Sequence, residues 1–221
     1  MTNSFKALSA LLSYPTQELK EAVGDIREIL YGEALAPRWA IDQVKKLLNE
    51  IDTLDLYELQ ERYVFLFDRT RSLSLHLFEH VHGESRDRGQ AMVDLRALYE
   101  QAGLDPDMRE LPDYLPMFLE YLSTRPVEEA RGLLAEPLTV IAALKERLAR
   151  RKTPYAAVLR VLEAIAGGAP SPKELDALRK APDDDPNNFE ALDALWEDSP
   201  VTFGPESDIG AAARNTGEAR S

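Results

Sequence analysis

The chain has 221 residues, of which 44% are hydrophobic and 29% are charged, so it is long enough for one domain with a substantial core. Its 39 acidic and 26 basic side chains give a net charge of −13, which repels a nucleic-acid backbone and attracts a basic peptide or protein surface. The lack of cysteine excludes disulfide bonds, thiolate nucleophiles and cysteine-ligated metal clusters. We therefore expect a protein partner and no nucleic acid.

No stretch of the sequence resembles a membrane span or a secretory signal. A helix that crosses a bilayer needs about 18 or more consecutive apolar residues, and no run approaches that length. The segment before Pro15 carries one lysine and a short stretch of leucine and alanine, without a long apolar region or a cleavage site. These features predict a cytoplasmic protein that is not an integral membrane protein.

Composition and periodicity both favour helices. Leucine (33) and alanine (27) greatly outnumber valine (10) and isoleucine (7), and β-branched residues are those that favour strands. Apolar residues recur three or four positions apart, which places them on one face of a helix. In chain order these stripes are Leu19–Leu30, Ile41–Ile51, Leu59–Phe67, Met92–Tyr99, Leu115–Leu122 and Leu138–Leu148. We predict an all-α fold of about nine to eleven helices.

Capping and helix-breaking residues separate the stripes. Asp55, with Glu58 three positions later, has the spacing of a capping box. Gly103 follows Tyr99 at the position where a left-handed glycine often ends a helix. Prolines lie between stripes or at expected first turns, where they cost no hydrogen bond. These prolines are Pro15, Pro37, Pro126, Pro137 and Pro154.

One segment departs from the helical pattern. Ser72–Leu77 alternates polar and apolar residues with period two, which taken alone is typical of a strand. A single strand in a helical chain would have no partner, so we predict a helix there.

The C-terminal region has a different character from the rest of the chain. Two short amphipathic stretches occur near 173–180 and 189–196, and past about Pro205 few apolar side chains remain. We predict a single compact helical domain over residues 1–204, with a core at about 4–166 and peripheral helices at about 171–198. Residues 205–221 are expected to form a disordered C-terminal tail.

All three histidines of the chain lie within seven residues, in His76-Leu-Phe-Glu-His80-Val-His82. His76, Glu79 and His80 match an inverted zincin motif, in which two histidines bind zinc and the glutamate acts as a general base. This match supports a metal-dependent hydrolase as an alternative function. The motif supplies no third ligand, and a di-iron site built on Glu79 and His82 would need a second histidine pair that the sequence lacks.

Two other interpretations of the histidine cluster remain open. One is a structural corner between helices, where histidines interact favourably with a helix C-terminus. The cluster also fits a polar recognition surface, because Arg86 and Arg88 crowd the same glycine-flanked loop. A second cluster, Glu110–Leu122, marks a helix start at Pro112 and Pro116. The sequence contains none of the glycine-rich phosphate-binding or serine-nucleophile motifs.

Two of these blocks resemble a known family. The run Leu77–Leu95 and the block Glu110–Leu122 are similar to the two signatures of the NarJ family, the delta-subunit chaperones of respiratory nitrate reductase. Tyr63-x-x-Leu-Phe-Asp68 and Leu195-Trp-Glu-x-x-Pro-Val-x-Phe203 also fit, so the resemblance covers about Leu11 to Phe203. Two positions depart from the pattern. Tyr114 stands where related chaperones often have histidine, and His76 stands where the family tends to be apolar.

The resemblance implies a fold, a function and a site. It implies a TorD-like helical chaperone, not an enzyme, that binds the apo catalytic (alpha) subunit of nitrate reductase, partly through its N-terminal segment. Such a chaperone keeps the subunit competent for insertion of molybdenum cofactor and iron–sulfur clusters, holds no cofactor itself and is absent from the mature enzyme. The expected client-binding residues are Glu79, His80, His82, Arg86, Asp87, Arg88, Glu110, Asp113 and Tyr114.

Overall fold

The structure is a computed structural model that describes residues 2–81, 86–104 and 110–183. The chain divides into the units Met1–Pro186 and Asn187–Ser221, and the second unit lies outside the described residues. The predicted helix near 189–196 and the predicted disordered tail also fall outside them. The only side chains of the described helices that are left out are those of Arg86 and Asp87.

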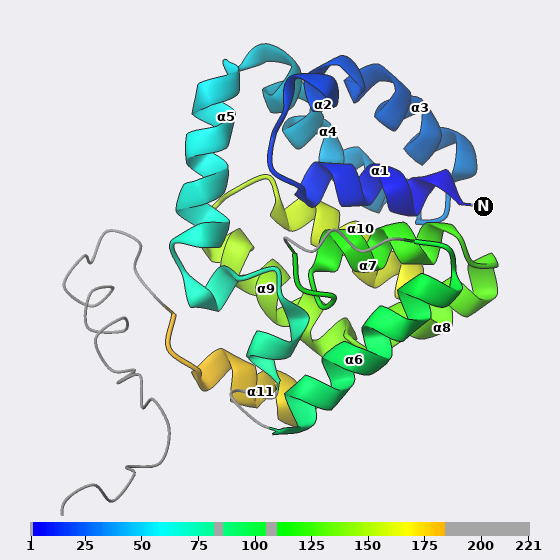
Figure 1. The fold of residues 1–221 in the computed structure, drawn as a ribbon. Helices are drawn as coiled ribbons and strands as arrows, with labels where there is room; N and C mark the ends of the chain where they lie inside the picture. Colours follow the sequence, from blue (N-terminus) through cyan, green and yellow to red (C-terminus); the bar gives the residue numbers. More distant parts are fainter. Residues whose placement is uncertain (1, 82–85, 105–109, 184–221) are drawn as a thin grey trace, which may run out of the picture. The chain divides into compact units, whose positions relative to one another are not determined.

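The predicted all-α class is confirmed, because the described residues form eleven α-helices (Figure 1). They are α1 (Asn3–Leu12), α2 (Gln17–Glu21), α3 (Val23–Glu33), α4 (Arg38–Thr53), α5 (Leu56–Tyr63), α6 (Arg86–Gln101), α7 (Leu115–Ser123), α8 (Val127–Ala135), α9 (Leu138–Arg150), α10 (Ala156–Ala166) and α11 (Pro172–Lys180). Three short irregular helices lie between α5 and α6 in the chain. They are the π-helix η1 (Val64–Asp68) and the 3₁₀-helices η2 (Arg71–Leu73) and η3 (Leu77–His80).

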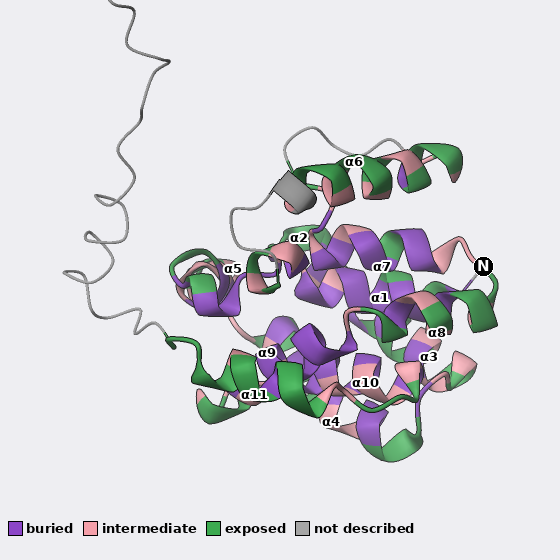
Figure 2. Cartoon of the chain, turned by 90° about the horizontal axis from the view of Figure 1, so that it is seen from below, coloured by how far each residue is buried: buried purple, intermediate pink, exposed green. Residues whose placement is uncertain are grey.

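The core lies between two packed sets of helices. α1 packs against α7 and α3, while α10 packs against α9 and α4. The predicted stripes supply this core: Ile41–Ile51 on α4, Leu115–Leu122 on α7 and Leu138–Leu148 on α9 all present buried faces. Figure 2 shows buried residues gathered on α1, α7, α9 and α10, whereas α6 and α11 are largely exposed.

Several local sequence signals act as predicted. The Asp55 carboxylate accepts the Tyr57 N–H at 2.9 Å and so caps the start of α5. Gly103 has φ 75°, and the Leu104 N–H donates to the Tyr99 carbonyl at 3.0 Å, which forms the left-handed C-terminal turn of α6. Pro37, Pro126 and Pro137 occupy the N-cap positions of α4, α8 and α9.

The prediction of a helix over Ser72–Leu77 is wrong. Ser72 and Leu73 end η2, Leu77 begins η3, and His76 between them forms an isolated antiparallel bridge with Tyr114. The expectation assumed that an extended residue would have no partner. The chain just before α7 supplies that partner, because the Leu115 N–H donates to the Leu75 carbonyl at 2.9 Å and the Leu77 N–H donates to the Asp113 carbonyl at 3.0 Å.

Candidate functional site

The site is built around a turn, residues 75–81, that the buried carboxylate of Asp113 holds in place. Asp113 is 0% exposed, and its two carboxylate oxygens accept the Phe78 N–H at 3.0 Å and His76 Nδ1 at 3.2 Å. Together with the bridge to Tyr114, these bonds fix the turn against the start of α7. Asp113 therefore acts by positioning the turn, since a fully buried side chain presents no surface to a partner.

His76 and His80 have opposite electrostatic environments. Burial lowers the pKa of His76, but the hydrogen bond and charge of Asp113 outweigh it, so the pKa of His76 is raised overall. Burial lowers the pKa of His80, and the nearby Arg147 cation lowers it further, against the opposing effect of a hydrogen bond to the Ser74 carbonyl. His80 is therefore neutral at pH 7. Because a carbonyl only accepts, His80 Nε2 carries the proton that it donates to Ser74 at 2.8 Å.

A pocket of about 420 Å³ opens beside this turn. Its walls come from η3, α6, α7, α9 and α11, and apolar side chains dominate them. The apolar lining residues are Leu77, Phe78, Val81, Leu95, Phe118, Pro137, Val140, Ala177 and Leu178. His80 and Thr139 add polar groups to the lining. Val81, which lines the pocket, is 58% exposed and so presents apolar surface to solvent.

Two glutamates line the same pocket from different helices. Glu136 precedes α9 and Glu174 belongs to α11, and both residues are exposed. Neither carboxylate forms an ion pair with a described residue within 4.0 Å, in contrast to Glu146 and Glu163 nearby. The pocket therefore combines an apolar interior with negative charge at its mouth. This arrangement suits an apolar segment that carries neighbouring positive charges.

The structure brings together some of the site residues predicted from the sequence. Glu79 lies in η3 next to the pocket, and its carboxylate is 3.8 Å from an Arg88 guanidinium nitrogen on α6. Glu110 is exposed and lies three residues before Asp113 in the chain. The Tyr114 hydroxyl shares a 2.9 Å hydrogen bond with the Tyr63 hydroxyl, and burial raises the pKa of Tyr114 to about 12.

The remaining predicted site residues cannot be placed in the same way. His82 lies outside the described residues. Arg86 and Asp87 begin α6, but their side chains lie outside the described part of the structure.

The alternative zinc site finds no support in the geometry of its motif. His76 precedes η3 and His80 ends it, so the two rings do not share the face of an α-helix. The His76 ring nitrogen Nδ1 is bonded to Asp113, and the His80 ring nitrogen Nε2 is bonded to Ser74. Within residues 2–81, 86–104 and 110–183, no group of three or more histidine, aspartate or glutamate side chains is arranged to hold a metal ion.

Sequence reasoning missed the pocket itself and a buried arginine behind it. Arg147 lies three residues after Leu144 on the apolar face of α9 and is 4% exposed. Its guanidinium donates to the Ser72 carbonyl at 2.7 Å and to the Leu178 carbonyl at 2.8 Å. A charged residue in register with an apolar stripe was a signal available in the sequence. The pocket walls, in contrast, come from five separate elements and carry no shared motif.

The described part of the chain is an all-helical protein with an apolar pocket. The nitrate reductase delta subunit family matches residues 16–160 of the chain. The nitrate reductase molybdenum cofactor assembly chaperone NarJ of Escherichia coli (strain K12) is 41% identical over 208 residues, which cover 93% of this chain and 87% of that protein. The probable chaperone NarW of the same strain is 40% identical and covers 90% of this chain and 82% of its own length.

A more distant relative gives the same result. The probable nitrate reductase molybdenum cofactor assembly chaperone NarJ of Bacillus subtilis (strain 168) is 34% identical, over 73% of this chain and 86% of that protein. The chain therefore belongs to the nitrate reductase delta subunit family, as its sequence blocks predicted. Among the described residues, no helix has the length and apolar character needed to cross a membrane.

Proposed function

We propose that this protein is an assembly chaperone that acts on a nitrate reductase and catalyses no reaction of its own. Its relatives carry the name of molybdenum cofactor assembly chaperones for that enzyme. The client is the apo catalytic (alpha) subunit, bound partly through its N-terminal segment in the cytoplasm. Binding keeps the subunit competent for insertion of molybdenum cofactor and iron–sulfur clusters, and the chaperone leaves before the mature enzyme reaches the membrane.

The single observation that carries this proposal is the apolar pocket with two carboxylates at its mouth. An amphipathic helix places apolar side chains on one face and charged side chains beside them, so it can fill the pocket and present lysine or arginine to Glu136 and Glu174. The net charge of −13 favours the same kind of partner over longer distances. The client segment is therefore expected to be a basic amphipathic helix.

The residues around the turn take different parts in this binding. We assign contact with the client to Glu79, His80, Arg88 and Glu110 and, from the sequence alone, to His82, Arg86 and Asp87. Asp113 and Tyr114 act from behind these residues, because one is fully buried and the other bonds to Tyr63. Neutral His80, which donates through Nε2, has Nδ1 left as an acceptor for a donor group of the client.

Calorimetry with the N-terminal peptide of the catalytic subunit tests the proposal. We expect binding at about micromolar affinity or tighter, with a modest loss at high salt. Val81→Asp places a charge on the exposed apolar wall, and we expect it to weaken binding by about tenfold. Val93→Asp is the matched control, because Val93 is 62% exposed on α6 and does not line the pocket. A wild-type protein that binds neither the peptide nor the intact apo subunit contradicts the proposal.

A further inference from the structure

Polar contacts fasten both ends of α11 to one face of α9. The Ser171 N–H donates to Thr139 Oγ1 at 3.0 Å at one end, and Arg179 forms two bonds of 2.7 and 2.8 Å with the Glu146 carboxylate at the other. The two helices therefore run parallel. Leu175 is the one fully buried side chain of α11 and packs on Ala142 and Ala143 of α9, while the partly buried Leu178 packs against the same cluster and against the main core.

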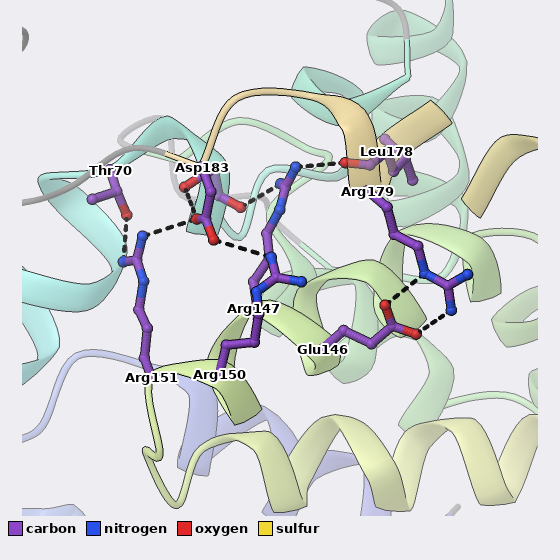
Figure 3. A network of polar contacts seen from close by, with 9 residues as sticks. Thr70, Glu146, Arg147, Arg150, Arg151, Leu178, Arg179 and Asp183 are labelled. Atoms are coloured by element: carbon purple, nitrogen blue, oxygen red, sulfur yellow. Dashed lines mark hydrogen bonds and ion pairs between the residues drawn. The ribbon is translucent and has the colours of Figure 1, made fainter. Parts of the chain in front are cut away.

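The segment after α11 is fastened by a second set of ionic contacts (Figure 3). The Asp183 carboxylate accepts hydrogen bonds from Arg150 and Arg151, each at 3.0 Å, and from the Ser72 hydroxyl at 3.1 Å. Arg150 is half exposed, so solvent and salt weaken its contribution. The attachment of α11 thus combines partly exposed ion pairs, which contribute little individually, with the apolar contacts of Leu175 and Leu178.

The face of α9 beneath α11 has the features of a seat for the end of a basic amphipathic helix. Ala142 and Ala143 leave room for large apolar side chains, and the Glu146 carboxylate receives a cation. The buried Arg147 donates to the Leu178 carbonyl, which is one of the last carbonyls of α11 and lacks a partner within the helix. The two alanines, the Glu146 carboxylate and the Arg147 donor together suit one class of ligand, the C-terminal end of a basic amphipathic helix.

α11 itself has the composition of that ligand. Its sequence places Leu175 and Leu178 three residues apart, with Arg179 and Lys180 in the last turn. These are the features that we assign to the client segment: apolar side chains at helical spacing next to positive charge. Leu178 and Ala177 also line the pocket, so the seat on α9 and the pocket are continuous.

We propose that α11 is a resident ligand of its seat on α9 and that the client helix displaces it on binding. This inference rests on the proposed function and names how the client site is regulated. The displaced helix opens the pocket along Ala142 and Ala143, and a client arginine or lysine takes the place of Arg179 on Glu146. Gly167, which ends α10 with φ 68°, and Gly168 after it provide the flexible link that displacement requires.

Displacement makes an unusual prediction about affinity. If the seat is free for only a tenth of the time, the apparent dissociation constant is about ten times the intrinsic one, and variants that release α11 bind the client more tightly. Arg179→Ala removes the bond from α11 to Glu146 while leaving Glu146 for the client. We expect the dissociation constant of the N-terminal peptide to fall by about three- to tenfold. Asp183→Ala, which lies outside the seat, should act in the same direction.

Ala177→Trp distinguishes displacement of α11 from the alternative in which α11 is a fixed wall of the pocket. Ala177 is exposed and lines the pocket, so a tryptophan there is compatible with folding and fills the pocket as long as α11 stays seated. A fixed wall predicts that peptide affinity falls by about tenfold or more, whereas displacement predicts an unchanged or higher affinity. Lys173→Trp, on the same helix but outside the pocket, is the control.

Hydrogen exchange on the unmodified protein provides an independent test. Displacement predicts that the backbone amides of residues 175–180 exchange faster when the peptide is bound, while those of α9 and α10 are unchanged or slower. The inference is overturned if these amides become protected, or if Arg179→Ala and Ala177→Trp both weaken binding. In either case the wild-type protein still binds the peptide, so the chaperone proposal survives. Lack of any binding to the wild type would instead remove the chaperone proposal and this inference together.

Discussion

α10 and α11 pack on the same helix, α9, but in contrasting ways. α10 buries seven residues, among them Leu159 and Leu162, both 0% exposed, and it joins α9 to α4. α11 fully buries Leu175, partly buries Leu178 and otherwise relies on ion pairs and hydrogen bonds. Apolar burial scales with the area removed from water, whereas exposed ion pairs are weak and sensitive to salt. α9 thus holds α10 permanently, through apolar burial, and α11 exchangeably, through weaker contacts.

The largest expected effect comes from a substitution in α10, the permanently packed helix. Leu159→Ala leaves a cavity in the core and should lower the free energy of unfolding by about 2–5 kcal/mol. Leu175→Ala should lower it by no more than about 1 kcal/mol, because the loss is limited to the small free energy with which α11 docks. Urea unfolding followed by circular dichroism measures both. Similar losses from the two substitutions would show that α11 is an integral part of the cooperative core.

The next largest effect concerns the turn at residues 75–81, which Asp113 holds in place. Asp113→Ala removes the acceptor of the Phe78 N–H and the partner of His76, and should cost about 1–3 kcal/mol of stability. Because the turn also forms one wall of the pocket, peptide affinity should fall as well. Asp113→Asn, which keeps an acceptor oxygen for Phe78, is the control and should retain more of both. Equal losses in the two variants would argue against the positioning role of the carboxylate.

The same turn gives the protein a pH-dependent stability. The folded-state pKa of His76 is raised above its ordinary value of 6.5. Its contribution is therefore fully present below pH 6.5 and is lost as the pH rises through the folded-state pKa. The pKa of His80 is lowered, so folding loses stability as the pH falls from 6.5 through that lower value. His76→Asn should abolish the loss on the alkaline side alone, as measured by urea unfolding between about pH 5 and 8.5.

The helices and their ends were readable from the sequence, because local rules determine them. Stripes such as Ile41–Ile51 and caps such as Asp55 depend on residues within one or two turns of each other. The segment 72–77 was misread because its partner, the chain around Asp113, is distant in sequence and close in space. The pocket was missed for the same reason: Val81, Leu95 and Val140 meet only after the chain has folded. The family blocks include the turn at residues 75–81 but give no sign of the cavity beside it.

Arg88 tests whether the turn recognises the client or only supports the fold. Its guanidinium is 3.8 Å from the Glu79 carboxylate, which is too long for a strong ion pair. If the turn recognises the client, Arg88→Ala should lower the free energy of unfolding by less than it weakens peptide binding. If Arg88 contacts the client, peptide binding should weaken by about 1–3 kcal/mol, measured by calorimetry. Parallel losses in stability and binding would identify a structural corner instead of a recognition surface.

The smallest expected effect concerns the two glutamates at the mouth of the pocket, and it separates the exchangeable surface from the general charge of the protein. Glu136→Gln and Glu174→Gln each remove one negative charge but keep the shape of the side chain. Glu136→Gln should weaken peptide binding by about two- to fivefold at low salt, as expected for an exposed charge pair. Glu174→Gln should weaken it to the same extent only if α11 stays in its seat. The difference from the wild type should disappear at about 1 M salt, where screening acts within a few ångströms.

A matched control variant is available outside the pocket. Glu120 is exposed on α7 and is not part of the pocket, so Glu120→Gln removes the same charge elsewhere. If all three variants weaken binding equally, the net charge of −13 attracts the client without a preferred site. If Glu174→Gln alone has no effect, the client has taken the place of α11, because the displaced helix carries Glu174 away from the bound peptide. The two rim glutamates thus test the pocket and the exchange of α11 with a single measurement.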